Sequence, residues 1–283
     1  MFKALHLVCP TLVFLLVVAG STTSGNAASA GEAAVKHHDR VAGYLSRSSI
    51  PDSVALLPAP PVCGSAAYAA DEDTYRVTRT LRGTVRWNQA TEDGNISFPE
   101  AASQFSCALE AAISEKETPH LYHLLQRTKS DAYQSVSTAK NHYHRIRPFV
   151  VNKESTCSPE YDSRLVKSGS YPSAHATTGW VWALILAEID PEHMDAILAR
   201  GMSYAQSRVI CGAHWQSDVT AGQILASGVV ARLHADPVFC AELAEAKAEL
   251  AAVRAKKLKP ERNCREEAAE SAYDSPRKTV VAP

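Results

Sequence analysis

The sequence predicts an all-α protein with a single helical domain. Apolar residues recur at three- and four-residue spacing through most of the chain, which is the period of helices with one buried face. Alternation typical of strands is scarce, and no internal repeat is evident. With 283 residues, of which 46% are hydrophobic, the chain is long enough to bury one sizeable core.

Residues 1–30 are expected to form a signal peptide. Lys3 supplies a positive charge, residues 11–19 form a short apolar stretch, and Ala28-Ser29-Ala30 fits a small-residue cleavage site. The apolar stretch is far shorter than the roughly 20 residues that span a bilayer, and no later stretch approaches that length. We therefore expect a protein that is periplasmic or secreted and has no membrane partner.

Residues 31–61 are expected to run over the surface in an extended conformation. This segment is polar, rich in alanine and serine, and ends in the proline-rich run Leu57-Pro58-Ala59-Pro60-Pro61. The helical domain is expected to cover residues 62–258. The charged tail, residues 259–283, is expected to be loosely ordered.

Three helices are expected in the first half of the domain, over residues 70–81, 100–114 and 119–143. Pro119 suits the start of the third helix, because the first residue of a helix needs no N–H.

Four further helices are expected in the second half. The first opens at Tyr171-Pro172-Ser173 and runs to Ile189; it is apolar on most faces, so we expect it to be central and buried. The others are expected over residues 190–208, 215–233 and 237–258.

Six cysteines follow the expected signal peptide: Cys63, Cys107, Cys157, Cys211, Cys240 and Cys264. An even number in an oxidising compartment favours disulfides, although the sequence leaves the pairing open. A bond between Cys157 and Cys211 is the one we favour, because both residues flank the motifs described next. No CxxC pair is present, which argues against a zinc site.

Two short blocks carry groups suited to binding a phosphate dianion. Lys140 and Arg147 lie seven residues apart, so they would share one helix face until Pro148 ends the helix. Further on, Ser173-Ala174-His175 places a hydroxyl, free backbone N–H groups and an imidazole at an expected helix N-terminus, where anions bind.

A third block contains Arg208, His214 and Asp218. His214 and Asp218 are four residues apart. On a helix, the carboxylate would hold one imidazole nitrogen and leave the other exposed as a nucleophile.

Each block alone has an ordinary structural explanation, as a solvated helix face or a paired histidine. Together they supply cations for the anion, a nucleophile with its orienter, and a second histidine to protonate a leaving group. The three blocks therefore predict a phosphate-transferring site.

Their spacing resembles the three-part signature of the PAP2 phosphatases: Lys140-x6-Arg147-Pro148, Pro172-Ser173-Ala174-His175 and Ser207-Arg208-x5-His214-x3-Asp218. More closely, the chain is similar to the class A bacterial non-specific acid phosphatases. That similarity extends over roughly residues 54–258 and includes the proline-rich run at residues 57–61 and the segments 141–147, 169–172 and 207–211.

The resemblance implies a helical bundle of the type shared by PAP2 enzymes and vanadium haloperoxidases. It also implies broad hydrolysis of small-molecule phosphate monoesters without a metal or other cofactor, and a homo-oligomer. His214 would be the nucleophile, Asp218 its orienter and His175 the general acid. The phosphate oxygens would be held by Lys140, Arg147, Ser173, Ala174 and Arg208.

These roles carry two further expectations. Because His175 would have to start protonated and His214 neutral, an acidic or near-neutral optimum is expected. Ala174 stands where the family usually has glycine, so we expect a negative φ there, and a methyl group that narrows the pocket beside His175.

Other functions fit the sequence less well. The formal net charge of -1 gives no field for nucleic acid. The pairs His120/His123 and His142/His144 have the spacing of metal ligands, but no carboxylate cluster accompanies them. A vanadium haloperoxidase remains an alternative because vanadate mimics the phosphate transition state. A non-catalytic phosphate-binding protein is another, although binding alone would need neither His175 nor His214.

Overall fold

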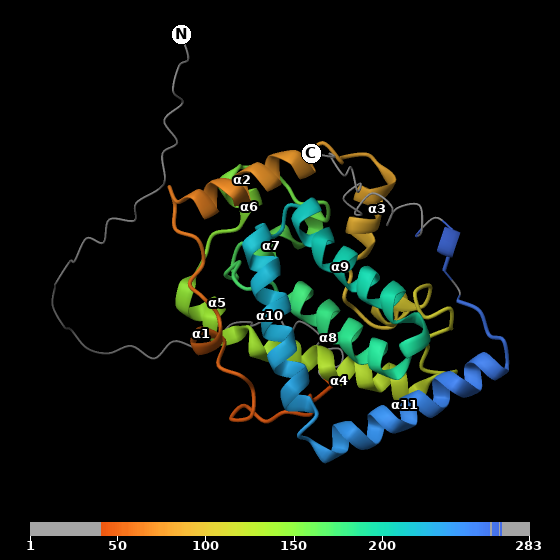
Figure 1. Ribbon diagram of the computed structural model, residues 1–283. Coiled ribbons are helices and arrows are strands. Elements are labelled where there is room, and N and C mark those ends of the chain that lie inside the picture. The colour runs from red at the N-terminus through yellow and green to blue at the C-terminus, as the bar shows by residue number, and fades with distance from the viewer. Residues whose placement is uncertain (1–40, 261, 266, 268–283) are drawn as a thin grey trace, which may run out of the picture. The chain divides into compact units, whose positions relative to one another are not determined.

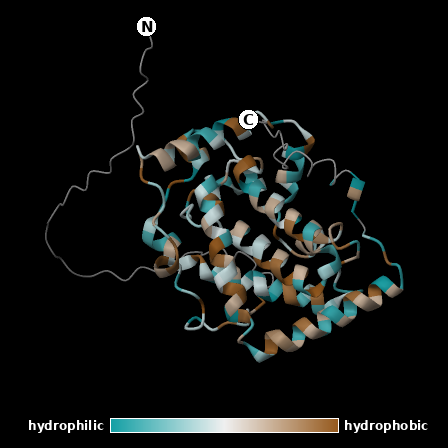
Figure 2. Ribbon diagram, viewed as in Figure 1, coloured by the Kyte–Doolittle hydropathy of each residue, from teal (hydrophilic) through white to brown (hydrophobic). Residues whose placement is uncertain are grey.

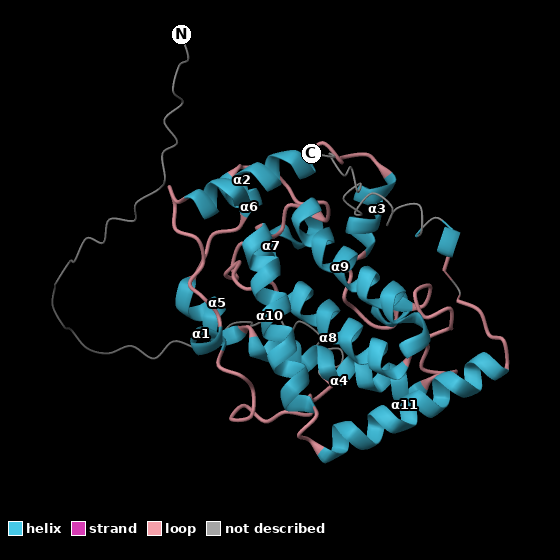
Figure 3. Ribbon diagram, viewed as in Figure 1, coloured by secondary structure: helices cyan, strands magenta, loops and turns pink. Residues whose placement is uncertain are grey.

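In the computed structural model, residues 41–260, 262–265 and 267 are described. Within that range the chain forms helices, turns and loops and no strand, which confirms the all-α prediction (Figure 3). The expected signal peptide and the first ten residues of the expected extended segment lie outside the described residues.

The centre of the bundle is α8 (Ala174–Ile189), as expected for a helix that is apolar on most faces. It packs against α9 (Met194–Ile210), α10 (Gln216–Leu233) and α4 (Pro119–Ser135), and α11 (Pro237–Ala255) packs against α4 (Figure 1). Apolar and polar residues alternate along α11, as expected for an outer helix with one face on the core (Figure 2).

Smaller helices surround this centre. They are α1 (Ser53–Leu56), α2 (Ala66–Arg79), α3 (Val85–Glu92), α5 (Ser137–Tyr143), α6 (Pro148–Val151) and α7 (Asp162–Leu165), with 3-10 turns at Glu100–Phe105, Pro159–Tyr161 and Pro191–His193. Helices α2 and α3 both pack on α9, and α1 packs on α5.

An aromatic cluster fills the core beside α8. Trp182 is fully buried; its ring meets Phe98 and Phe105 edge-on, and its indole Nε1 donates a hydrogen bond to the carbonyl of Leu125 at 3.0 Å. Truncating such a residue to alanine costs about 3–5 kcal/mol. The core therefore fixes α8 rigidly and, with it, the helix N-terminus that enters the site.

Capping explains where several helices begin. The Ser173 hydroxyl accepts from the N–H of Ala176 at the start of α8, and Asp236 accepts from two N–H groups at the start of α11. Each accepted bond satisfies a backbone donor that the helix cannot pair itself. The helix expected over residues 237–258 is thereby confirmed, and α10 begins one residue after its expected start.

Two expected helices differ from the structure. Residues 100–114 form only the 3-10 turn Glu100–Phe105, after which the chain turns through Glu110 at a φ of 50°. The helix expected over residues 119–143 is interrupted at Val136, where α4 ends and α5 begins. Ser135 and Ser137 flank this break, and both hydroxyls bond to backbone carbonyls of α4, which competes with regular helix bonding.

The tail is better fixed than the sequence indicates. Cys264 forms a disulfide with Cys107, and Glu267 pairs with Arg200 at 3.1 Å. These two contacts tie the described residues 264 and 267 to the helical domain, and residues 268–283 of the expected loose tail lie outside the described residues.

Among the described residues, no single helix is long and apolar enough to cross a bilayer. Helices α10 and α11 reach such a length and apolar content only together, and that pair is bent by 98°.

Candidate active site

The three blocks of the sequence meet where several helices begin or end. Lys140 lies on α5, Arg147 directly before α6, and Ser173 to His175 at the N-terminus of α8. Arg208 lies in the last turn of α9, His214 in the loop after it and Asp218 in the first turn of α10. Helix ends thus supply the site with side chains and with unpaired backbone groups.

His214 is held in a defined tautomer. Its Nε2 lies 2.9 Å from Nη1 of Arg147, and because a guanidinium can only donate, Nε2 carries the lone pair. The proton of the neutral ring then resides on Nδ1, which lies 3.4 Å from both Asp218 Oδ2 and Ser170 Oγ. The imidazole therefore presents an unprotonated nitrogen to the cations of the site.

The contact between His214 and Asp218 does not arise from a shared helix, as the sequence suggested. Helix α10 begins at Gln216, so His214 precedes it. The Asp218 carboxylate instead caps the start of α10. Its Oδ2 accepts hydrogen bonds from the N–H of Trp215 at 2.9 Å and from the hydroxyl of Ser170. Gly212 makes the preceding turn possible with a φ of 80°, which alanine adopts only at a cost.

Arg147 and Lys140 are also arranged differently from the prediction. The helix ends at Tyr143, and His144 adopts a φ of 45°, so the two cations do not share a helix face. Pro148 begins α6 instead of ending a helix. Both cations nevertheless reach the site, because Arg147 Nη1 donates to the Ala213 carbonyl at 2.9 Å and Lys140 Nζ donates to the Gly169 carbonyl.

Burial shapes the ionisation of these cations. The pKa of Lys140 is lowered well below its usual value by burial and by the neighbouring charge of Arg147. Burial likewise lowers the pKa of Arg147 to about 10 and reduces that of Arg208. Burial and mutual repulsion make the charged forms of these cations unfavourable. A bound anion would offset that repulsion, so the site favours an anion.

Arg208 gives the most direct sign of a ligand. Its side chain is only 3% exposed, and its Nε and Nη1 are buried without a hydrogen-bond partner. Buried donors that stay unpaired cost about 1–3 kcal/mol each. Two of them on one cation indicate a site built for an anion.

His175 is buried at the N-terminus of α8, and its Nε2 donates to the Gly94 carbonyl at 3.1 Å. Nδ1 is thereby the nitrogen that can take up and return a proton. Burial, followed by the charge of Arg208, lowers the pKa of His175 well below its usual value. In the ligand-free protein His175 is therefore neutral near pH 7; its expected protonated state during catalysis stays a prediction.

Ala174 has a helical backbone with negative φ, as expected. Its side chain, however, belongs to an apolar cluster with Leu57, Val136, Tyr171, Ala221 and Leu225. We therefore expect the methyl group to face this cluster, and whether it narrows the pocket beside His175 stays a matter for the substrate panel described below.

The disulfide favoured from the sequence is present: Cys157 is bonded to Cys211 at the end of α9. Cys157 also donates its N–H to the Cys211 carbonyl at 3.0 Å. The bond fixes the loop before α7 to the turn between Arg208 and His214. Cys240 is free and exposed.

Sequence reasoning missed several residues that contact the site. Ser170 and Arg145 bind Asp218, Asp71 binds Arg145, and the Gly94 carbonyl binds His175. Arg145 lies inside the first block, so its position was a usable signal; Asp71 and Gly94 lie far from every block. Across the described part of the chain, no three His, Cys, Asp or Glu side chains converge as a metal site would require.

Comparison with known proteins agrees with this geometry. The family model of the PAP2 superfamily matches residues 130–238, which contain all three blocks. The non-specific acid phosphatase of Providencia stuartii is 45% identical over 212 residues, covering 75% of this chain and 86% of the relative. This chain belongs to the PAP2 family.

Two further relatives support the same assignment for this PAP2 enzyme. The acid phosphatase of Zymomonas mobilis is 41% identical over 72% of this chain and 77% of its own length. The non-specific acid phosphatase of Salmonella typhimurium is 42% identical over 70% of this chain and 80% of its own length. Family and relatives together make the chain an acid phosphatase.

Proposed function

We propose that this acid phosphatase hydrolyses phosphate monoesters through a covalent phosphohistidine on His214, without a metal ion. The observation that carries the proposal is the lone pair of His214 Nε2, which faces the guanidinium of Arg147 at a buried site where Arg208 has unpaired donors. A phosphate dianion entering there would meet cations on its oxygens and a nucleophile on its phosphorus.

The reaction then takes two steps. His214 Nε2 attacks phosphorus, the bond from phosphorus to the ester oxygen breaks, and His175 gives its Nδ1 proton to the departing alkoxide. Water next attacks the phosphohistidine while His175 takes the proton back, and inorganic phosphate leaves. His175 gains its starting proton with the substrate, because the dianion raises its proton affinity.

Charge stabilisation supplies much of the rate. Lys140, Arg147 and Arg208 surround the phosphoryl oxygens, and the Ser173 hydroxyl accepts from Ala176 and so keeps its own hydrogen for a phosphate oxygen. Removing one such preorganised donor typically costs about 2.7–4 kcal/mol of transition-state stabilisation.

The same cations account for activity in acid. Burial and the charges of Arg147, Lys140 and Arg208 lower the pKa of His214 well below its usual value. A depressed pKa keeps the nucleophile unprotonated at a pH where an ordinary histidine would be charged. The site therefore supports catalysis at acidic pH.

The experiment is to trap the intermediate. Acid-labile, base-stable label from a radioactive phosphomonoester should appear on His214 after rapid denaturation, and His214→Ala should lose both the label and several orders of magnitude of turnover. Excess EDTA should leave the activity intact. Label on a serine or an aspartate, or activity lost to EDTA and restored by a divalent cation, would overturn the proposal.

Three further properties complete the proposal: export, phosphotransfer and a homo-oligomer. The signal-like residues 1–30 favour export, and N-terminal sequencing of the periplasmic or secreted protein would detect the cleavage. An alcohol that replaces water in the second step would make the enzyme a phosphotransferase. The homo-oligomer is tested by light scattering on the purified protein.

A further inference from the structure

A buried chain of charged side chains runs behind His214. Arg145, in the loop after α5, donates from Nη2 to Asp71 Oδ2 on α2 at 2.7 Å and from Nη1 to Asp218 Oδ1 on α10 at 2.6 Å. The side chains of Arg145, Asp71 and Asp218 are 8%, 4% and 0% exposed. One guanidinium therefore bridges two buried carboxylates, and the second of these faces the nucleophile.

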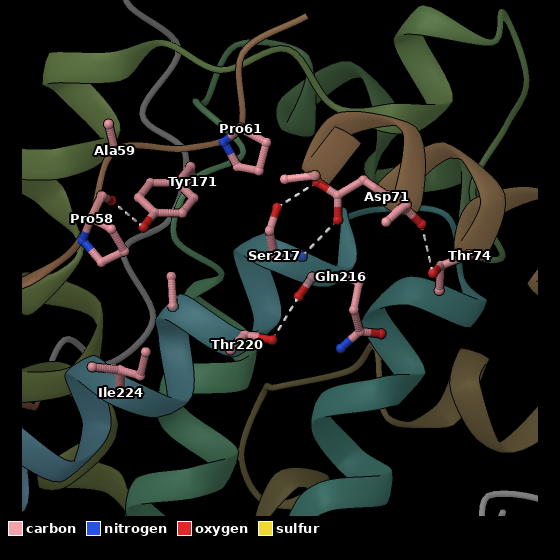
Figure 4. A pocket seen from close by; sticks show the side chains of 13 residues that line it. Pro58, Ala59, Pro61, Asp71, Thr74, Tyr171, Gln216, Ser217, Thr220 and Ile224 are labelled. Atoms are coloured by element: carbon pink, nitrogen blue, oxygen red, sulfur yellow. Dashed lines mark hydrogen bonds between the residues drawn. The ribbon is translucent and has the colours of Figure 1, made fainter. Parts of the chain in front are cut away.

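Ser217 ties this bridge to the start of α10. Its N–H donates to Asp71 Oδ1 at 2.9 Å and its hydroxyl donates to Asp71 Oδ2, while Arg145 Nη1 donates to the same hydroxyl oxygen at 2.7 Å. Figure 4 shows Asp71 and Ser217 facing each other among the residues that line a pocket of about 390 Å³. The hydrogen bonds between Ser217 and Asp71 thus join the first turn of α10 to α2.

The Arg145 bridge fixes the orientation of the Asp218 carboxylate relative to His214. Arg145 occupies Oδ1, so the carboxylate cannot rotate without breaking a buried ion pair. Oδ2 is then left for the N–H of Trp215 and the hydroxyl of Ser170, and it lies 3.4 Å from His214 Nδ1. A donor fixed behind the carboxylate sets the orientation of the imidazole.

The bridge also sets the charge next to the nucleophile. Lys140, Arg147 and Arg208 act on His214 from three other elements, and His175 is electrostatically coupled to it from α8. Asp218 is the carboxylate on the Nδ1 side. Without Arg145 its negative charge would be uncompensated and would favour a protonated, non-nucleophilic His214.

We infer that Arg145 and Asp71 are positioning residues for the phosphatase reaction: they hold Asp218 so that His214 presents an unprotonated Nε2 to the phosphate. The inference rests on the proposed phosphohistidine mechanism. It concerns residues outside the phosphate-binding set, since the hydrogen bonds of Arg145 go to Asp71, Ser217 and Asp218.

The test compares Arg145→Gln, Arg145→Lys and Asp71→Asn by steady-state kinetics on p-nitrophenyl phosphate and by the rate of phosphohistidine formation. Arg145→Gln should lower kcat by roughly 10- to 100-fold with KM nearly unchanged. The acid limb of its profile of kcat/KM against pH should move to higher pH. Arg145→Lys should recover part of kcat, and Asp71→Asn should lower kcat less and leave the acid limb in place.

Matched controls come from the same pocket. Thr74 and Thr220 line it, but their hydroxyls bond only within their own helices, to the carbonyls of Ala70 and Gln216. Thr74→Val and Thr220→Val should therefore keep kcat within about twofold. If Arg145→Gln fails to fold, Ser217→Ala replaces it in the kinetic comparison. That variant removes the hydroxyl that Arg145 and Asp71 share but keeps every charge, and it should lower kcat severalfold.

The result that overturns the inference is a kcat in Arg145→Gln, or in Ser217→Ala where that variant is used, that matches the threonine controls. A raised KM with unchanged kcat also overturns it, because Arg145 would then be binding phosphate. Failure of the proposed function looks different: wild-type enzyme would carry no label on His214. If the inference alone fails, the wild type and the variants label equally fast.

Discussion

Arg208 lies on α9 with two buried nitrogens that have no hydrogen-bond partner. Arg208→Met removes these unpaired donors and the buried charge while keeping a side chain of similar length. Relief of two donors at about 1–3 kcal/mol each, less the packing lost, should raise the free energy of unfolding by about 2 kcal/mol. For a protein of this size that corresponds to a Tm about 4–8 °C higher.

Activity should change in the opposite direction. Losing one donor to the phosphoryl oxygens should lower kcat by about 10²–10³-fold. Thermal unfolding with and without inorganic phosphate, alongside hydrolysis of p-nitrophenyl phosphate, measures both effects. Phosphate at 100 times its Kd should stabilise the wild type by about 2.7 kcal/mol, and the variant should respond only weakly at the same concentration.

Arg200 provides the control. It lies on the same helix and is equally buried, but it donates to Asp93, Gln104 and Glu267. Arg200→Met removes the ion partner of the buried Asp93 carboxylate and should cost about 3–5 kcal/mol. If Arg208→Met is destabilised as much as Arg200→Met in phosphate-free buffer, the donors of Arg208 are satisfied without an anion, and the reasoning is refuted.

Three further changes have defined outcomes. Because the folded-state pKa values of His175 and His214 are depressed, the unfolded chain binds more protons below about pH 6.5. The free energy of unfolding should therefore fall between pH 6.5 and 5 by up to about 1.4 kcal/mol per pH unit for each histidine, and the Tm should fall with it. The loss should be smaller in His214→Asn, and an equal slope would contradict the assignment. Ala174→Gly should lower the stability by about 1 kcal/mol through the lost methyl group and leave the ranking of bulky and small phosphomonoesters unchanged in a substrate panel. Gly169→Ala should raise KM, since a Cβ there would lie 2.7 Å from the carbonyl of Lys140; an unchanged KM would show that the backbone shifts without moving the lysine.

The sequence predicted the long helices because their apolar spacing coincides with burial. Helices α8, α10 and α11 begin and end within three residues of the expected positions. For residues 100–114 the same reasoning predicted a helix wrongly. Their apolar residues are buried, but they lie in a turn that the Cys107–Cys264 disulfide holds in place. Periodicity reports burial, and a helix is only one way to bury an apolar residue.

For the site, residue types were predictable and their geometry was not. Side-chain chemistry pointed to the cations and both histidines, which the structure brings together. The expected helical relations between Lys140 and Arg147, and between His214 and Asp218, were wrong because the chain leaves the helix at His144 and enters the next one only at Gln216. Gly212 is a local turn signal before α10, whereas His144 adopts its positive φ without a glycine, so residue type did not reveal the first of these two breaks.

The hydrogen-bond partners of Lys140 and Arg147 favour an anion at this site. Lys140 is held by the carbonyl of Gly169, and Arg147 by the carbonyls of Leu165, Ser168 and Ala213. A carbonyl dipole orients a cation without cancelling its charge, so the positive field remains available for phosphate. Arg145 differs, because two carboxylates neutralise its charge. Under the proposed mechanism, an arginine held by carbonyl dipoles would bind the anion, whereas an arginine held by carboxylates would position the nucleophile.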